Sequence, residues 1–261
     1  MLTFPQIDPI LLQLGPLAIR WYGLMYTLSF ILGWPLLKRR AARWMPQLSQ
    51  DALGDIAIYT LIGLVLGGRV GYVLFYNFDF FLQQPLSLFR IWEGGMSFHG
   101  GLLGGLAACL IYSKRTGIHC LELADLVFPI VPLGLFFGRI GNFINGELWG
   151  RVSDAPWAMV FPGAGELPRH PSQLYEAFLE GVVLFILLNW LGRRARRRGF
   201  LVGAFCMGYA WSRFLVEFVR EPDAHLGLLS MGLSMGQWLT VPLFLLGAWL
   251  MWRPERQAAE V

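Results

Sequence analysis

The chain has 261 residues, of which 56% are hydrophobic and only 15% are charged, and its mean hydropathy is +0.52. This composition is too apolar for a soluble domain of this length and indicates an integral membrane protein. The net charge of +4 says little by itself, because the placement of the basic residues along the chain carries the information.

The N-terminal segment, residues 2–16, combines apolar residues with prolines and is too short to cross a bilayer, so we expect it to lie in the membrane interface. Seven later stretches are long and apolar enough to form transmembrane helices. In chain order they are 17–37, 52–76, 95–113, 121–145, 175–192, 200–219 and 236–252. The first does not match a cleavable signal peptide, because its basic cluster follows the apolar run.

The longest external loop, about 146–174, follows the fourth of these stretches and contains four prolines and several glycines. We expect it to form a small, irregular but ordered cap on the outer face. No low-complexity linker divides the chain. The sequence therefore predicts one all-α membrane domain over residues 1–261, built as a bundle of about seven transmembrane helices.

The orientation of the bundle is predicted from the Lys and Arg residues, which gather in cytoplasmic loops of membrane proteins. Of the 21 basic residues, 13 follow the first, third, fifth and seventh predicted helices, on one side of the membrane. They are Lys38, Arg39, Arg40, Arg43, Lys114, Arg115, Arg193, Arg194, Arg196, Arg197, Arg198, Arg253 and Arg256. The N-terminus should then be periplasmic and the C-terminus cytoplasmic. Nucleic-acid binding by Arg193–Arg198 is the weaker alternative, because this cluster lies between two predicted spans.

Small residues recur every four positions in the second and third predicted helices, at Gly63, Gly67 and Gly71 and at the pairs Gly100/Gly104 and Gly101/Gly105. Glycines at this spacing let two helix backbones approach closely in lipid. We interpret them as a packing device rather than as part of the chemistry.

Four cationic or titratable side chains fall at one depth in the outer half of the predicted bundle. At about 1.5 Å per residue, His99 lies roughly 6 Å and Arg139 and Arg213 roughly 9 Å below the outer surface, and Arg69 lies at a similar level. Polar side chains inside a membrane are costly and need a partner or a function. Glu147 and Glu217 supply part of the balancing negative charge, and a bound phosphate would supply the rest.

Two helical faces support such an anion site. Arg offers a planar fork of donors that suits phosphate oxygens, and Asn can bond an ester carbonyl or orient an arginine. The faces consist of Arg139, Asn142 and Asn145 on one helix and Tyr209, Arg213 and Glu217 on another. The alternative is a set of buried polar clasps between helices, which weighs most for Arg69 among its neighbouring glycines.

His99 is the one histidine within a predicted span, and it lies in the arginine layer. Nearby arginines disfavour its protonated form, which suits a general base. A structural histidine is the alternative. The other histidines (His119, His170 and His225) and the cysteines (Cys109, Cys120 and Cys206) are scattered. They indicate neither a metal site nor a disulfide framework, and we assign the cysteines packing roles.

Several segments closely resemble the prolipoprotein diacylglyceryl transferases of bacterial inner membranes. The longest is GRIGNFINGELWG at 138–150, which has little chance of arising in a membrane helix by composition. The others, in family order, are FPQIDP (4–9), IRWYGLMY (19–26), SFHGG (97–101), HPSQLYEA (170–177) and REPD (220–223). The six segments are distributed along nearly the whole chain.

The resemblance implies that the diacylglyceryl group of phosphatidylglycerol is moved onto the lipobox cysteine thiol of a prolipoprotein signal peptide, with release of glycerol 1-phosphate. The depth argument places the active site in the outer leaflet, and we expect membrane lipids as partners and no cofactor, metal or nucleic acid. Carried over by motif, the important positions are Tyr26, His99, Arg139, Asn142, Glu147, Gly150, Tyr209, Arg213 and Glu217. To the substrate-binding positions the depth argument adds Arg69.

Two other functions compete with this interpretation. A non-enzymatic phospholipid or anion transporter would also need arginines in its spans, but along the full depth of the bundle. A membrane phosphatase would need a nucleophile or a metal-ligand set that the motifs do not supply.

Overall fold

The structure is a computed structural model that describes residues 2–15, 17–76, 78–90, 95–194, 197–222 and 229–254, without the side chains at 17 and 80. Of the residues used above, Arg196, Asp223, His225 and Arg256 lie outside the described residues. The chain divides into two compact units. Unit 1 comprises Met1–Leu37 and Val127–Val261, and unit 2 comprises Lys38–Leu126, and each is described by itself.

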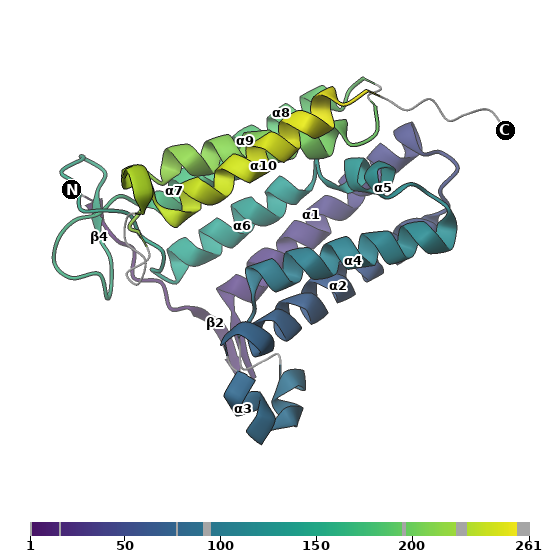
Figure 1. The fold of residues 1–261 in the computed structure, drawn as a ribbon. Coiled ribbons are helices and arrows are strands. Elements are labelled where there is room, and N and C mark those ends of the chain that lie inside the picture. The colour runs from purple at the N-terminus through teal and green to yellow at the C-terminus, as the bar shows by residue number, and fades with distance from the viewer. Residues whose placement is uncertain are drawn as a thin grey trace. The chain divides into compact units, whose positions relative to one another are not determined.

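Unit 1 contains the long helices of the C-terminal half. The elements are β1 (Leu2–Thr3), β2 (Ile10–Leu14), β3 (Leu17–Arg20), the start of α1 (Trp21–Trp44), α6 (Val131–Ile144), β4 (Met159–Val160), α7 (Ser172–Glu176), the π-helical η3 (Ala177–Val183), α8 (Leu184–Leu191), α9 (Phe200–Val216), η4 (Ser230–Gly232) and α10 (Met235–Trp252). Helices α9 and α10 run side by side in Figure 1. Gly203 and Gly247 permit this, since a Cβ added to either would lie 2.7 Å from the other's backbone oxygen.

The segment that follows α6 is irregular but tied together by strand pairing. Strand β1 pairs in parallel with β4, which brings Phe4 onto Phe161 with ring centroids 5.0 Å apart. Both rings are buried and form a small apolar core with Met159. The N-terminal segment predicted to lie in the interface therefore supplies a strand to this core, and it continues into the antiparallel pair β2–β3.

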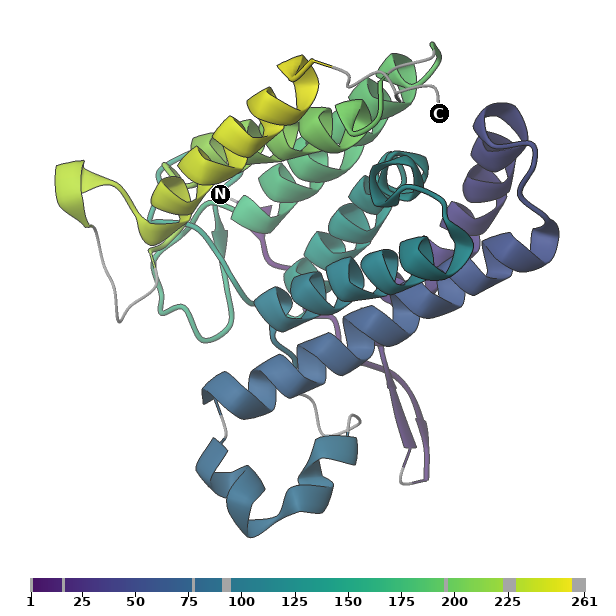
Figure 2. The ribbon, with the colours of Figure 1, turned by 45° about the vertical axis from the view of Figure 1, so that its right-hand side comes forward.

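Unit 2 contains the rest of α1, α2 (Gln50–Tyr76), α3 (Phe78–Gln83), η1 (Pro85–Phe89), α4 (Phe98–Thr116) and α5 (Cys120–Val127). Helices α2 and α4 lie against each other along most of their length (Figure 2). A Cβ at Gly67 would lie 2.3 Å from the Gly100 oxygen, and one at Gly104 would lie 2.0 Å from the Gly63 oxygen. The predicted close packing is confirmed for Gly63, Gly67, Gly71, Gly100 and Gly104, where a Cβ would lie within 3.0 Å of a neighbouring atom. It is not confirmed for Gly101 and Gly105, whose nearest neighbours lie at 3.4 Å.

The structure is mostly helical, and three of its described helices are long and apolar enough to cross a membrane, or four if a broken pair counts as one span. The three are Gln50–Tyr76, Ser172–Leu191 and Met235–Trp252. The predicted span over 121–145 is not one continuous helix, because α5 ends and α6 begins around a turn at 128–130; together the two helices are apolar enough for one broken span. Pro129 occupies the turn and Pro132 the first turn of α6, where a proline needs no intrahelical donor.

The first predicted span also differs from the structure. Its first four residues form strand β3, and α1 then continues past position 37 to Trp44. Hydropathy places the apolar run correctly but does not distinguish strand from helix at its start.

Candidate active site

A cluster of three arginines and three glutamates occupies the interior of unit 1. The members are Arg139 of α6, Glu176 of α7, Glu180 of η3, Arg213 of α9, and Glu217 and Arg220, which directly follow α9. Charges out of water are stable only when they are paired, and here the two signs are equal in number.

Glu176 is the centre of the cluster, and its side chain has no exposed surface. Its Oε2 lies 3.0 Å from Arg139 Nε, an ion pair without hydrogen-bond alignment. Its Oε1 accepts from Arg213 Nη1 and, at 2.9 Å, from Arg220 Nη1. One carboxylate thus holds all three guanidinium groups.

The other two carboxylates each hold one arginine. Glu180, also with no exposed surface, accepts from Arg139 Nη2 at 3.3 Å. Glu217 accepts from Arg213 Nη2 and, at 3.1 Å, from the Ser234 hydroxyl. The predicted placement of Arg213 and Glu217 on one helical face is confirmed by this ion pair, which joins residues four apart.

Glu147 is carried by a sharply turned loop directly after α6. Gly146 and Leu148, on either side of it, both have positive φ, at 65° and 60°. This left-handed conformation is uncommon for a residue with a side chain such as Leu148 and recurs at functional sites. Asn142 donates to Glu147 Oε1 at 2.7 Å and Asn145 to the same oxygen at 3.4 Å.

Glu147, one of the two glutamates expected to balance the arginines, makes no ion pair with an arginine among the described residues. Within the described residues, Arg213 pairs with Glu176 and Glu217, while Glu147 is exposed and held by two asparagines. The reason lies in the turn after α6, which directs Glu147 toward α6's own last turn.

Gly150 lies where two backbone segments cross. A Cβ there would lie 2.5 Å from the Val219 oxygen and 2.7 Å from the His170 Cβ. Its N–H donates to the His170 oxygen at 2.8 Å. The glycine therefore has a packing role.

Three tyrosines surround the arginines of unit 1. Tyr22 and Tyr26 share a hydrogen bond of 3.2 Å between their hydroxyls, and they pack on the glycine face of α6 at Gly141 and Gly138. Tyr209, one turn before Arg213, stacks on Phe205 and lies close enough to Arg139 and Arg213 to interact with both. The site thus has aromatic walls beside its cationic groups.

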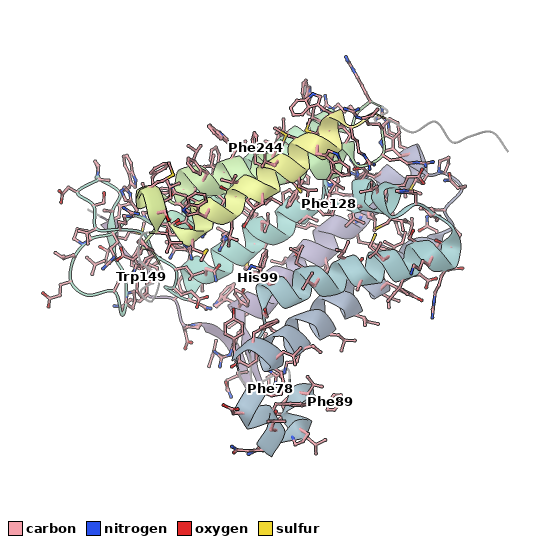
Figure 3. The ribbon with its side chains drawn as sticks, in the orientation of Figure 1. Phe78, Phe89, His99, Phe128, Trp149 and Phe244 are labelled. Atoms are coloured by element: carbon pink, nitrogen blue, oxygen red, sulfur yellow. The ribbon has the colours of Figure 1, made fainter. Side chains whose placement is uncertain are left out.

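His99 and Arg69 belong to unit 2. His99 is exposed and lies in the first turn of α4, where Figure 3 labels it. Ser97 starts this helix by accepting from the Gly100 N–H at 3.2 Å. Arg69 is buried and donates to three backbone oxygens, those of Ser87, Leu88 (3.0 Å) and Gly95 (3.1 Å). These contacts favour the clasp interpretation of Arg69.

Sequence reasoning missed Glu176 and Glu180. The available signal was two acidic residues four apart near the start of the apolar stretch 175–192, with Glu176 inside HPSQLYEA. Without Glu176 and Glu180, the sequence-based prediction assigns the protein's negative charge near the arginines to Glu147 and Glu217 alone.

A separate polar network lies in the segment between α6 and α7. The Trp157 indole donates to the Tyr175 hydroxyl at 2.6 Å, and that hydroxyl lies 3.0 Å from His170 Nδ1. Partial burial lowers the pKa of the His170 imidazole below its ordinary value. The Tyr175 hydroxyl thus links the Trp157 indole to the His170 ring.

Comparison with known proteins identifies the family. The model of the family described as prolipoprotein diacylglyceryl transferase matches residues 9–253. The chain belongs to this family. It is similar to proteins named phosphatidylglycerol–prolipoprotein diacylglyceryl transferase from Idiomarina loihiensis (55% identical over 97% of this chain and 96% of the relative) and Photobacterium profundum (56% over 96% and 94%). A relative of the same name from Brucella anthropi is 51% identical over 99% of this chain and 96% of its own.

Proposed function

We propose that the protein transfers the diacylglyceryl group of phosphatidylglycerol to the cysteine thiol of a prolipoprotein. The thiol sulfur forms a bond to the terminal glycerol carbon of the diacylglyceryl group, and the bond from that carbon to the phosphate oxygen breaks. The electron pair leaves with the oxygen, so glycerol 1-phosphate is the leaving group. The observation that carries the proposal is family membership together with a buried cluster of arginines.

The role of the cluster follows from the charge that develops in this step. Carbon–oxygen cleavage places negative charge on the phosphate, and preorganised donors lower the energy of such a transition state. Arg139 and Arg213 keep 18% and 16% of their side-chain surface exposed, whereas the glutamates behind them keep at most 4%. A phosphate therefore meets guanidinium groups first. Tyr26, Asn142, Glu147, Gly150, Tyr209 and Glu217 shape and orient this site.

The thiol proton needs an acceptor, and His99 is the proposed base. Its exposed position at the start of α4 allows a substrate to reach the ring. A neutral imidazole accepts the proton as the sulfur attacks.

We further propose seven spans in the inner membrane of a bacterium, a periplasmic N-terminus, a cytoplasmic C-terminus and an active site in the outer leaflet. The 13 clustered basic residues support this orientation. A reporter fused after Val261 should be active in the cytoplasm, and one near Gly163 in the periplasm. A periplasmic reporter signal at Val261 would contradict the seven-span arrangement.

The test of the function is a transfer assay with detergent-purified protein, phosphatidylglycerol and a synthetic peptide that carries a lipobox cysteine. Mass spectrometry should detect the thioether product and glycerol 1-phosphate. Replacement of His99 by Gln should reduce the rate by about 10²- to 10⁴-fold, the usual contribution of a general base, while the folded fraction is kept. Transport of lipid without a thioether product would contradict the proposal.

A further inference from the structure

Glu180 has contacts that the proposed reaction does not require. Its side chain is fully buried, one oxygen lies 3.3 Å from Arg139 Nη2, and the other oxygen has no hydrogen-bond partner among the described residues. A buried carboxylate with an unused oxygen is costly, so its retention in the cluster needs an explanation.

The local backbone is shaped to bring Glu180 to Arg139. Glu180 lies in the middle of η3, a π-helical segment, and such segments occur frequently at functional sites. The next residue, Gly181, allows η3 to approach α6, since a Cβ there would lie 2.6 Å from the Phe136 Cβ. The close approach places the carboxylate behind Arg139.

The guanidinium nitrogen atoms of Arg139 and Arg213 fall into those that face a carboxylate and those that do not. Nε and Nη2 of Arg139 and both Nη atoms of Arg213 face carboxylates. Within the described part of the chain, Arg139 Nη1 and Arg213 Nε have no such partner. These are the donors that remain for an anion, and the buried carboxylates lie on the opposite edges.

The two phosphates of the reaction differ in charge. A phosphodiester lipid has one negative charge, whereas a phosphate monoester such as glycerol 1-phosphate approaches two at neutral pH, because its second pKa is about 6. Arginines without counter-charges would therefore hold the product more tightly than the substrate. A carboxylate behind them weakens the binding of both anions and weakens that of the dianion more.

We propose that Glu180 is a positioning and charge-balancing residue that lowers the affinity of the Arg139–Arg213 pair for phosphate monoesters and so promotes product release. The inference rests on the proposed function, because it takes the arginines as the phosphate site. It assigns Glu180 no contact with the substrate.

The experiment compares the full-length protein with Glu180→Gln, which keeps the size of the side chain and removes its charge. Transfer is measured at increasing concentrations of glycerol 1-phosphate and, separately, of inorganic phosphate. The inhibition constant for glycerol 1-phosphate should fall by about tenfold or more, and KM for phosphatidylglycerol should fall less. A purely structural role would not tighten anion binding. Equal inhibition by inorganic phosphate would show that the glycerol part contributes nothing to the affinity gained.

The matched control is Glu166→Gln, which removes the same charge from an exposed residue and should leave both constants unchanged. Glu180→Asp withdraws the carboxylate by one methylene and should lower the inhibition constant by a smaller factor. If Glu180→Gln does not fold, the inhibition constant of Glu180→Asp tests the proposal in its place. An inhibition constant that is unchanged or higher in the folded Glu180 variants would overturn the proposal.

A second measurement separates this outcome from a failure of the proposed function. Glycerol 1-phosphate should raise the thermal unfolding temperature of Glu180→Gln at lower concentrations than it does for the original protein. This binding assay does not depend on transfer. If Glu180→Gln binds the anion more tightly but the original protein forms no thioether, the transferase activity is refuted and the effect of Glu180 on anion affinity is kept.

Discussion

The two units differ in the groups that join their central helices, although glycines also bring α9 and α10 of unit 1 together. In unit 2, α2 and α4 are joined through glycines whose missing side chains let backbone meet backbone. In unit 1, α6, α7, η3 and α9 are joined through three arginines and three glutamates. The glycine contacts require that no side chain is present at these positions, and the charge cluster requires equal numbers of positive and negative groups.

This difference indicates which unit has polar groups in its interior that can bind a ligand. Glycine packing contributes van der Waals contact and leaves no group for a ligand. A charge cluster stabilises its helices only while every member is paired, so it responds to an added anion. We therefore expect substitutions in the glycine interface to change stability and substitutions in the cluster to change turnover.

The largest effect is expected for Arg139. Arg139→Ala removes the proposed phosphate donor and should reduce turnover per folded molecule by roughly 100-fold or more, the scale of losing an oxyanion donor. Arg139→Lys should also be severely impaired. The compact ammonium group of Lys lacks the planar fork with which a guanidinium can bind two carboxylates and a phosphate at once. Turnover is measured on purified, folded protein.

The control for Arg139 is the double variant Arg139→Ala/Glu180→Gln, which removes one charge of each sign. It should recover much of the thermal stability lost in Arg139→Ala, because fewer buried carboxylates remain unpaired, but it should not recover turnover. Near-normal turnover in a folded Arg139→Ala protein would make this arginine a clasp and move the site toward Arg213.

The glycine interface supplies the next largest effect. Gly104→Ala places a Cβ 2.0 Å from the Gly63 oxygen and should destabilise the protein by about 1–3 kcal/mol through overpacking. Gly105→Ala is the matched control, since its Cβ meets only Leu64 side-chain atoms at 3.4 Å or more. Thermal unfolding in detergent measures both. A Gly104→Ala protein as stable as Gly105→Ala would refute the close packing of α2 and α4.

A smaller, pH-dependent effect is expected at His170 in unit 1. Burial lowers the pKa of the folded imidazole, so the unfolded chain binds more protons as the pH falls through the ordinary His value of about 6.5. The contribution of His170 to stability is therefore complete above that value and is lost as the pH falls below it. His170→Gln should reduce the difference in unfolding temperature between pH 7.5 and pH 5.5. An unchanged difference would show that this ring titrates alike in both states.

The smallest effect is expected for the cysteines. Cys109 and Cys120 are 11 residues apart in the sequence, and their sulfurs lie 2.8 Å apart in unit 2, whereas Cys206 is buried in α9. Replacing all three with Ser or Ala should leave most of the transferase activity, because the acceptor thiol belongs to the substrate. Complete loss of activity in a folded triple variant would instead point to a covalent enzyme intermediate.

The sequence by itself determined the membrane character, the helical pairs that need close glycine contact, and the family. These follow from local properties: the hydropathy of a stretch, the spacing of glycines, and a motif such as GRIGNFINGELWG. The spacing of Arg213 and Glu217 also predicted their shared face, since an α-helix returns to the same side after four residues.

Only the tertiary structure decided how the charges are paired. Glu176 contacts arginines that are 37 residues before it, 37 after it and 44 after it, and no local pattern encodes such a set. The break between α5 and α6 and the turn that brings Glu147 to Asn142 and Asn145 were likewise decided by packing and backbone conformation. Hydropathy and spacing describe one helix at a time, whereas a buried charge is stabilised by whichever helix comes to lie beside it.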